Sequence, residues 1–216
     1  MSCPTSLTWR DNTSGQSGMR CRHSNDRSSP RIWRRICVIV FALFAGSCDI
    51  PTFTMSVEPP IVTFGPPVWI AETDDTGAVT GRQLVPGLVR NDAGWKLSLS
   101  KQAFAAARRG VTELAYRGLY DDFYKPGVYQ CIACRTTLFA SVEKYDSRTG
   151  WPSFRWPVAE TNVRISWDES WGMRRRAVQC ARCGSHLGHV FNDGPLPGGR
   201  RYCINSASLY FVPTAR

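Results

Sequence analysis

The sequence has little of what a membrane-spanning or a nucleic-acid-binding protein needs. The apolar run at residues 36–46 is eleven residues long, short of the roughly 20 residues that cross a bilayer as a helix. Lys and Arg outnumber Asp and Glu by 27 to 17. Half of the resulting charge of +10 falls before residue 48, and the rest is spread thinly along the chain. Because no basic stripe is clustered, we expect no nucleic-acid partner.

The first 47 residues are similar to an export leader. Residues 31–35 supply a basic flank, and the short apolar run follows directly, which is typical of a signal peptide. Residues 45–48, Ala-Gly-Ser-Cys, are similar to the sequence at which bacterial lipoproteins are cleaved and lipidated. We therefore expect an exported protein, periplasmic or membrane-anchored by its N-terminus, with Cys48 as a candidate lipid anchor. An uncleaved anchor helix is the alternative.

Residues 48–90 are expected to form a proline-rich tether and a short hairpin. Five prolines fall between residues 51 and 67, as in an extended linker. Residues 68–90 alternate loosely between apolar and polar side chains around Asp74–Gly77, which indicates a hairpin. This segment is therefore expected to precede the main domain.

The remaining residues predict a β-rich body with a helix near its start. Ser100 precedes the good helix formers of residues 101–109, and Gly110 follows them, so a capped helix is predicted there. After Gly127 the sequence contains short β-like runs separated by Gly, Pro, Asp and Asn. The fold class predicted for the main domain is mainly β, a β-rich α+β arrangement.

A repeat in the C-terminal half contains four of the nine cysteines. Residues 128–138 and 177–187 both read Q-C-x-x-C-x-x-x-L, a strand that enters a tight turn with two thiols. Four thiolates are the ligand set of a closed structural zinc site, so zinc would join two separated hairpins. Two disulfides are the alternative, since an exported protein could form them. The expected zinc ligands are Cys131, Cys134, Cys180 and Cys183.

Cys203 stands apart from these pairs. A lone cysteine is commonly a small buried hydrophobe, but in a strand Arg201, Cys203 and Asn205 would share one face. A guanidinium near a thiol favours the thiolate, which is the nucleophilic form. His186 and His189, two of only three histidines, follow the second cysteine pair and are candidate proton donors. We therefore expect Cys203 to be a nucleophile.

Three motifs, together with the two cysteine turns, give the chain a family resemblance. The motifs are GWPSF at residues 150–154, HLGHVFNDGP at residues 186–195 and RYCINSASL at residues 201–209. They resemble the B-type methionine sulfoxide reductases, and the resemblance covers residues 91–213. It implies two antiparallel sheets with N-terminal helices and a structural zinc between the two CxxC knuckles. It also implies an enzyme, a peptide-methionine (R)-S-oxide reductase.

By this resemblance, the thiolate of Cys203 attacks the sulfur of methionine-R-sulfoxide in oxidised proteins or peptides. Methionine leaves, and a sulfenic acid remains on the cysteine. Trp151 matches the aromatic residue against which the substrate methyl group rests. The positions that shape the polar surroundings of the sulfoxide oxygen are matched by His186, His189, Asp193, Arg201 and Asn205.

The chain departs from the family pattern at two positions. Many members carry a second cysteine two residues before the tryptophan of GWPSF, but here Thr149 stands in that place. Because threonine cannot resolve a sulfenic acid, we expect regeneration by an external thiol, thioredoxin-like or other. Arg135 stands where glycine commonly follows the first cysteine pair, which affects turn geometry only. The alternatives to the enzyme are a non-catalytic zinc-knuckle module that binds peptides and a disulfide-stapled secreted domain.

Overall fold

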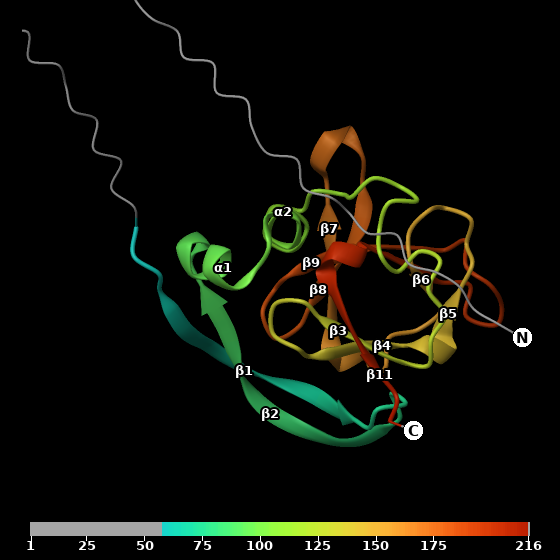
Figure 1. The fold of residues 1–216 in the computed structure, drawn as a ribbon, viewed down its shortest axis with the longest axis horizontal. Coiled ribbons are helices and arrows are strands. Elements are labelled where there is room, and N and C mark those ends of the chain that lie inside the picture. Colours follow the sequence, from blue (N-terminus) through green and yellow to red (C-terminus); the bar gives the residue numbers. More distant parts are fainter. Residues whose placement is uncertain (1–57, 216) are drawn as a thin grey trace, which may run out of the picture. The chain divides into compact units, whose positions relative to one another are not determined.

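The computed structural model describes residues 58–215 (Figure 1). The predicted leader, Cys48 and the first part of the predicted tether lie outside the described residues. The domain boundaries assigned there stay predictions. Within residues 58–215, no helix combines the length and the apolar character needed to cross a membrane.

A long hairpin precedes the main body. Strand β1 (Val62–Thr73) pairs antiparallel with β2 (Val79–Arg90), and the two form a sheet of their own. The hairpin is longer than the short one expected, because β1 already includes residues 62–67 of the predicted tether. Its prolines fit there because the pairing register shifts between Gly65 and Pro67, and a two-stranded sheet consists of edge strands, where proline is tolerated.

Two short helices follow the hairpin. The predicted helix is confirmed as α2 (Lys101–Arg109): the Ser100 hydroxyl accepts from the Ala103 N–H at 3.1 Å, and Gly110 ends the helix with φ 68°. Helix α1 (Asp92–Ser98) was not predicted from the residues alone. Its sequence signal is Asn91, whose side-chain oxygen accepts from the Gly94 N–H at 3.0 Å and so caps the helix.

Two antiparallel sheets form the body (Figure 1). The three-stranded sheet has the order β11-β3-β4, and the six-stranded sheet has the order β5-β6-β10-β9-β8-β7. This arrangement confirms the predicted β-rich fold with antiparallel sheets and N-terminal helices. The strands are β3 (Gly127–Cys131), β4 (Thr137–Ala140), β5 (Lys144–Tyr145), β6 (Ser153–Phe154), β7 (Val163–Asp168), β8 (Arg175–Cys180), β9 (His186–Phe191), β10 (Arg201–Ile204) and β11 (Leu209–Pro213).

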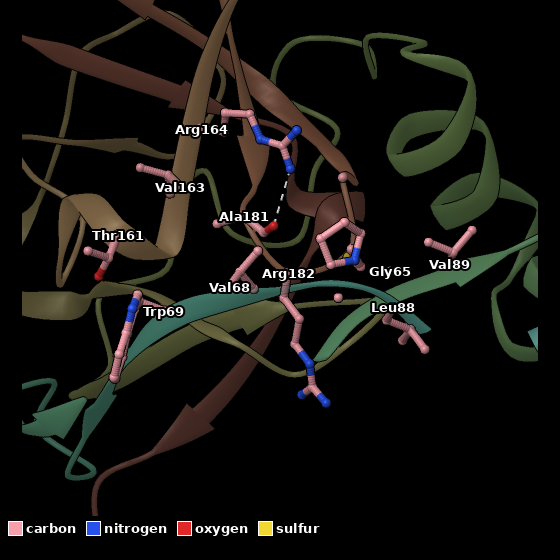
Figure 2. A pocket seen from close by; sticks show the side chains of 14 residues that line it. Gly65, Val68, Trp69, Leu88, Val89, Thr161, Val163, Arg164, Ala181 and Arg182 are labelled. Atoms are coloured by element: carbon pink, nitrogen blue, oxygen red, sulfur yellow. Dashed lines mark hydrogen bonds between the residues drawn. The ribbon is translucent and has the colours of Figure 1, made fainter. Parts of the chain in front are cut away.

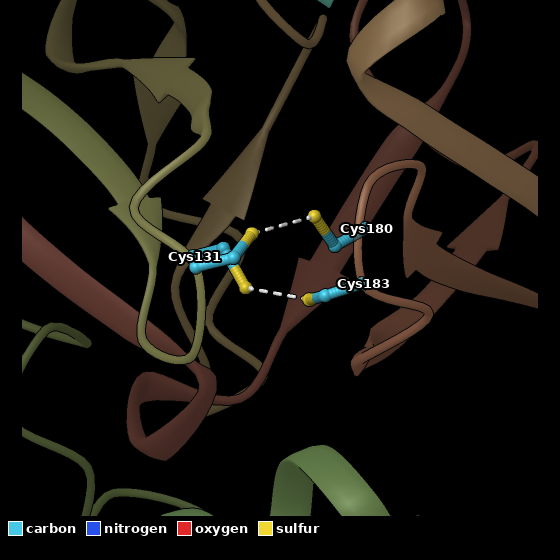
Figure 3. A group of neighbouring side chains, drawn as sticks. Cys131, Cys180 and Cys183 are labelled. Carbon is cyan, nitrogen blue, oxygen red and sulfur yellow. Dashed lines mark hydrogen bonds between the residues drawn. The ribbon is translucent and has the colours of Figure 1, made fainter. Parts of the chain in front are cut away.

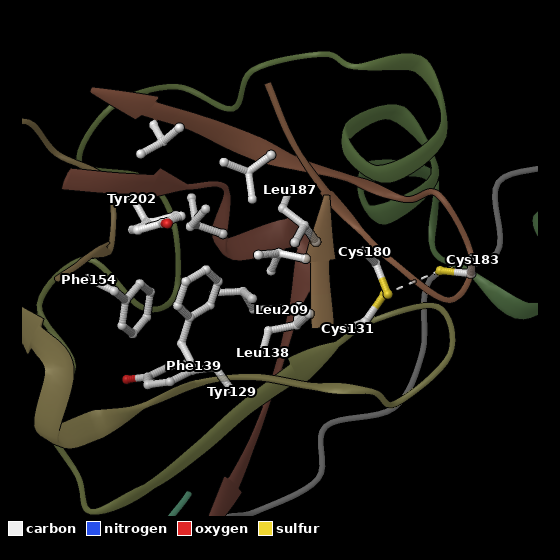
Figure 4. Close-up of a cluster of buried hydrophobic side chains, with 14 of the residues drawn as sticks. Tyr129, Cys131, Leu138, Phe139, Phe154, Cys180, Cys183, Leu187, Tyr202 and Leu209 are labelled. Carbon is white, nitrogen blue, oxygen red and sulfur yellow. Dashed lines mark hydrogen bonds between the residues drawn. The ribbon is translucent and has the colours of Figure 1, made fainter. Parts of the chain in front are cut away.

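Aromatic side chains fill the core between the two sheets (Figure 4). Phe139 of β4 stacks on Phe154 of β6 with ring centroids 4.5 Å apart, and Tyr129 of β3 meets Phe154 edge-on at 5.0 Å. Large buried rings of this kind supply much of the hydrophobic stabilisation of a small domain. The cluster also includes Cys131, Cys180 and Cys183, so the cysteine turns are packed against the core.

Asn162 joins the hairpin to the body. Its side chain is fully buried and accepts from the Ala71 N–H at 2.7 Å. It also donates to the Ala71 carbonyl at 3.0 Å and to the Thr137 carbonyl at 2.9 Å. One amide therefore satisfies polar backbone groups of β1 and β4, which would otherwise be buried without partners.

Replacing Asn162 with alanine should lower the free energy of unfolding by about 3 kcal/mol, because several buried backbone groups lose their partner. Urea denaturation followed by circular dichroism measures this. Asn192→Ala is the matched control, since Asn192 is exposed and its amide contacts only Arg176 in the hydrogen bonds of the described residues. Equal stability of the two variants would contradict the role assigned to Asn162.

Candidate active site

The four cysteines of the two turns face one another across a small space (Figure 3). All four are free thiols, and their sulfur atoms lie within 4.8 Å of one another. The Sγ atoms of Cys131 and Cys183 are 3.6 Å apart, and those of Cys134 and Cys180 are 3.5 Å apart. A tetrahedral Zn–S₄ site with bonds of about 2.3 Å would separate its sulfurs by about 3.8 Å. The cluster therefore has the ligand type and the size to hold a metal ion.

The two turns that carry these thiols have the same backbone structure. In the first, the Arg135 N–H donates to the Cys131 carbonyl at 2.9 Å, and in the second the Gly184 N–H donates to the Cys180 carbonyl at 2.9 Å. Arg135 has φ 63° and Gly184 has φ 67°, so both occupy the left-handed region that glycine favours. The Arg135 guanidinium lies 3.5 Å from the centroid of the Tyr210 ring, a cation–π contact that offsets part of this strain. The departure from glycine at Arg135 thus leaves the turn intact.

Cys203 lies on the central strand β10, between β6 and β9. It pairs with Ser153 on one side and with His189 on the other, so these three side chains share one face of the sheet. Arg201 and Cys203 are half-buried while Tyr202 and Ile204 are buried, which is the predicted alternation along the strand. Next to the GWPSF motif, the Thr149 hydroxyl oxygen lies 4.0 Å from the Cys203 sulfur.

A cavity of about 120 Å³ opens at the Cys203 thiol. Gly188 of β9 allows the strands to meet there, because a Cβ at this position would come within 2.1 Å of the Cys203 carbonyl oxygen. The Trp151 indole is oriented by its N–H, which donates to the Glu113 carbonyl at 3.0 Å. The cavity thus combines one thiol with an aromatic wall and a few polar groups. Its lining includes Trp151, Arg175, His189, Phe191, Cys203 and Asn205.

Burial and charge act on the Cys203 thiol in opposite directions. Burial raises its pKa, while the Arg201 guanidinium and the hydroxyls of Thr149 and Ser153 lower it by less. The sequence-based expectation that arginine favours the thiolate is correct in direction, but burial outweighs it. The thiol is therefore protonated at neutral pH and needs a proton acceptor to react.

Alkylation of Cys203 by iodoacetamide should have a pH midpoint above the value of about 8.5 that is usual for a cysteine thiol. Arg201→Met should move the midpoint further upward, since it removes a cation that favours the thiolate. Mass spectrometry of the Cys203 peptide gives the rate separately from those of the other cysteines. Arg176→Met is the matched control. A midpoint below the usual value, or one that Arg201→Met leaves in place, would contradict this account.

His189 forms a hydrogen bond with the carboxylate of Asp168, a residue that lies outside the three sequence motifs. Its Nε2 lies 2.7 Å from Asp168 Oδ2 at the end of β7, and Arg175 of β8 donates to the same oxygen at 2.9 Å. Hydrogen bonds from Ser170 and His189, together with the charge of Arg175, hold the pKa of Asp168 well below its usual range. Asp168 is thus ionised and accepts the Nε2 proton, which leaves His189 Nδ1 as the ring's proton acceptor.

His186 lies behind His189 rather than in the Cys203 cavity. The two imidazole centroids are 5.2 Å apart in an edge-to-face arrangement, and His186 lines a neighbouring cavity of about 390 Å³. Burial is the main cause that lowers the pKa of His186 to about 4, and burial also lowers the pKa of His189. Both imidazoles are therefore neutral at pH 7.

The other predicted polar residues have well-defined partners. Arg201 and Asp193 form a two-point ion pair, with Nε to Oδ1 at 2.9 Å and Nη2 to Oδ2 at 2.8 Å. Asn205 lines the Cys203 cavity, but its amide donates to the Leu187 carbonyl at 3.1 Å and accepts from the Glu113 N–H at 3.1 Å. Arg201 thus presents its charge beside the thiol, while Asn205 holds the end of β10 in position.

A larger groove of about 610 Å³ lies between the hairpin and the second cysteine turn (Figure 2). The Leu88 N–H donates to the Arg182 carbonyl at 2.9 Å at its edge, and Trp69 of β1 forms part of its lining. This groove and the Cys203 cavity have no lining residue in common.

Comparison with known families agrees with the geometry of the site. Residues 99–213 match the SelR domain, which covers more than half of the chain. The chain belongs to the SelR family.

Several proteins named peptide methionine sulfoxide reductase MsrB are similar to this SelR chain. One from Herminiimonas arsenicoxydans is 46% identical over 127 residues, 59% of this chain and 93% of that protein. One from Pseudomonas paraeruginosa is 53% identical over 119 residues, 55% of this chain and 90% of that protein. One from Thioalkalivibrio sulfidiphilus is 48% identical over 126 residues, 58% of this chain and 91% of that protein. The predicted family is confirmed, and the chain is an enzyme of the methionine sulfoxide reductase type.

Proposed function

We propose that this SelR protein reduces methionine-R-sulfoxide in peptides and proteins, with Cys203 as the nucleophile. The observation that supports this most is the position of Cys203: its thiol opens into a small cavity beside the Trp151 indole and opposite His189. A substrate methyl group fits an aromatic wall, and the sulfoxide oxygen needs proton donors or positive charge. The R configuration rests on the family resemblance.

The chemistry begins with a proton transfer. His189, oriented by Asp168, takes the Cys203 proton through its Nδ1, and the thiolate attacks the sulfoxide sulfur. The protonated His189 then returns the proton to the sulfoxide oxygen, and the positive charge of Arg201 stabilises the developing negative charge. The protonated oxygen then leaves the substrate sulfur and bonds to the Cys203 sulfur as the S–S bond breaks, so methionine departs with the electron pair of that bond and Cys203 becomes a sulfenic acid. One thiol and one sulfoxide thus become one sulfenic acid and one thioether.

The metal proposed for the four-cysteine cluster is zinc in a structural role. Cys131, Cys134, Cys180 and Cys183 would hold it, and four protein thiolates leave no open coordination position. When bound, zinc would supply folding energy at this site. The two turns would then hold the start of β4 and the start of β9 at fixed positions, and His189 lies on β9.

Regeneration is proposed to need an external thiol. Thr149 faces the Cys203 sulfur from the position of the usual second cysteine, and its hydroxyl is 2.8 Å from that of Ser147. Neither hydroxyl can displace the sulfenic oxygen to form a disulfide. Two equivalents of an external thiol, from a thioredoxin-like protein or a small molecule, would return Cys203 to the thiol, with a disulfide and water as products.

One turnover without reductant should leave a sulfenic acid on Cys203 that reacts with dimedone. Mass spectrometry should find the dimedone adduct on the Cys203 peptide and no disulfide that includes Cys203. A Thr149→Cys variant should behave in the opposite way: its new sulfur would start about 4 Å from Cys203, so a small shift forms the disulfide. A Cys203 disulfide in the protein with Thr149 would contradict direct reduction by an external thiol.

A stereospecific assay tests the proposed function. The full chain is incubated with dithiothreitol and with either dabsylated methionine-R-sulfoxide or the S epimer, and methionine is measured by chromatography. Turnover of the R epimer alone is expected. Turnover of neither epimer would leave the peptide-binding module as the better account, and turnover of the S epimer alone would contradict the proposed specificity.

Export of the enzyme is also a proposal. It rests on the leader-like sequence of residues 1–47, and anchoring through Cys48 rests on residues 45–48. A periplasmic or membrane-anchored reductase would repair oxidised methionine in other exported proteins.

A further inference from the structure

Three donors from outside the second cysteine turn, residues 180–184, bond to carbonyl oxygens of that turn. The donors are Arg164 Nη2 to Ala181 at 3.2 Å, the Leu88 N–H to Arg182 at 2.9 Å and Arg108 Nη1 to Cys183 at 2.9 Å. Of the three acceptors, only Cys183 also contributes a sulfur to the four-cysteine cluster (Figure 3). Arg108 is therefore the donor that contacts a proposed metal ligand directly.

Arg108 is a half-buried cation without a carboxylate partner. It lies in the last turn of α2, and its guanidinium is 4.7 Å from the centroid of the buried Trp95 ring, which fixes the side chain. Among residues 58–215, no carboxylate forms an ion pair with Arg108, whereas its neighbour Arg109 pairs with Asp92. Removing a cation from water without a negative partner costs free energy. A negative charge close to Arg108 would offset this cost.

The four-cysteine cluster becomes such a charge when it binds zinc. The thiols lose their protons to bind the metal, and four thiolate charges exceed the two positive charges of Zn²⁺. The proposed site would thus carry a net negative charge beside the core cluster, where screening by water is weak. The guanidinium of Arg108 bonds to the backbone of one ligand, so it lies close to that charge.

Ser185 links Arg108 to the cluster a second time. It is fully buried, and its Oγ is 3.4 Å from Arg108 Nη1 and 3.2 Å from the Cys183 sulfur. When Cys183 is a thiolate, this hydroxyl can accept from Arg108 and donate to the sulfur. Hydrogen bonds to a charged acceptor are stronger than those between neutral groups. Arg108 thus contacts Cys183 both directly, at its carbonyl oxygen, and through Ser185.

We propose that Arg108 is a positioning residue of the metal centre: it fixes the position of Cys183 and offsets the negative charge of the zinc-bound thiolates. The inference rests on the proposed zinc site and goes beyond its ligand set. It makes retention of zinc depend on α2, a helix that supplies no ligand. It also makes retention depend on Trp95 of α1, which packs against Arg108 and precedes the SelR match at residue 99.

The test compares the zinc affinity of the full chain with that of four variants. Arg108→Met removes the guanidinium, Arg108→Lys keeps the charge, and Ser185→Ala removes the bridging hydroxyl. Arg90→Met is the matched control: the Arg90 guanidinium lies 5.0 Å from the same Trp95 ring, but among the described residues it donates to Ser98 rather than to the cysteine turn. Competition with EDTA, a chelator of known affinity, gives the zinc dissociation constant without a measurement of activity. Thermal midpoints in excess zinc confirm that the variants are folded.

Arg108→Met should weaken zinc binding about tenfold or more, the range usual for residues that hold metal ligands in place. Arg108→Lys and Ser185→Ala should each weaken it by about threefold, because each keeps part of the contact with Cys183. Arg90→Met should stay within about twofold of the wild type.

A zinc affinity of Arg108→Met equal to that of the wild type, or an equal loss in Arg90→Met, overturns the role of Arg108. If Arg108→Met does not fold even in excess zinc, Arg108→Lys and Ser185→Ala decide: a loss in both supports the proposal, and wild-type affinity in either overturns it. A wild type that binds no zinc would instead count against the proposed metal site.

Discussion

Replacing Cys203 with serine is expected to abolish methionine sulfoxide reduction, with a fall of at least about a thousandfold in kcat/KM. A serine hydroxyl is too weak a nucleophile to attack the sulfoxide sulfur, and it cannot hold the oxygen as a sulfenic acid. The change removes little volume and leaves the strand pairing of β10 in place. The measurement is turnover of N-acetyl-methionine-R-sulfoxide with dithiothreitol in excess.

Ser153→Ala is the matched control for this variant. Ser153 is the cross-strand neighbour of Cys203 and is fully buried, so a general disturbance of the strand pairing would appear there as well. A modest loss is expected, since its hydroxyl helps to lower the pKa of the thiol and otherwise bonds to the Ser147 hydroxyl and the Trp151 carbonyl. Activity that survives in Cys203→Ser would show that Cys203 is not the nucleophile.

Replacing Cys180 with serine is expected to remove the metal and to unfold much of the domain. Structural zinc contributes about 10 to 16 kcal/mol of binding free energy in small zinc peptides, while whole domains are stable by about 5 to 15 kcal/mol. Cys180 is buried within the core cluster, so the loss of its thiolate also leaves a polar hydroxyl in an apolar place. Elemental analysis gives the zinc content, and circular dichroism gives the fraction folded.

The Cys203→Ser variant serves here as the control, because Cys203 lies outside the metal cluster. It should keep about one zinc per chain and an unchanged thermal midpoint. A strong chelator should reproduce the unfolding of Cys180→Ser in the wild type. The proposal of a structural zinc site would be wrong if Cys180→Ser kept the wild-type thermal midpoint. It would also be wrong if the purified wild type held no metal and contained disulfides in the cluster.

Features encoded by short-range patterns could be predicted from the sequence. The two CxxC turns repeat the same residues at the same spacing, and the structure shows the same backbone hydrogen bond in each. Ser100 and Gly110 predicted the limits of α2 because each satisfies a backbone group at a helix end. Strand alternation placed Arg201 and Cys203 on one face for an equally local reason.

Features that depend on how distant strands pair could not be predicted. Asp168 and His189 meet only because β8 lies between β7 and β9, so a carboxylate at the end of one strand reaches across to a histidine two strands away. A register shift in the pairing of β8 with β9 also puts His186 on the same face as His189, with the two ring centroids 5.2 Å apart, although the residues lie three apart in one strand. No spacing within the sequence carries that information.

The hairpin is joined to the body by hydrogen bonds that extend beyond the N-terminal limit of the family domain. The SelR match begins at residue 99. Asn162 lies within it and is fully buried, and its side-chain amide forms hydrogen bonds with the backbone of Ala71 of β1. The second cysteine turn likewise accepts from Leu88 of β2. A chain cut to the family boundary would lose these hydrogen bonds and the strand that covers Asn162. In this protein, the contacts that hold the domain together therefore include residues N-terminal to residue 99.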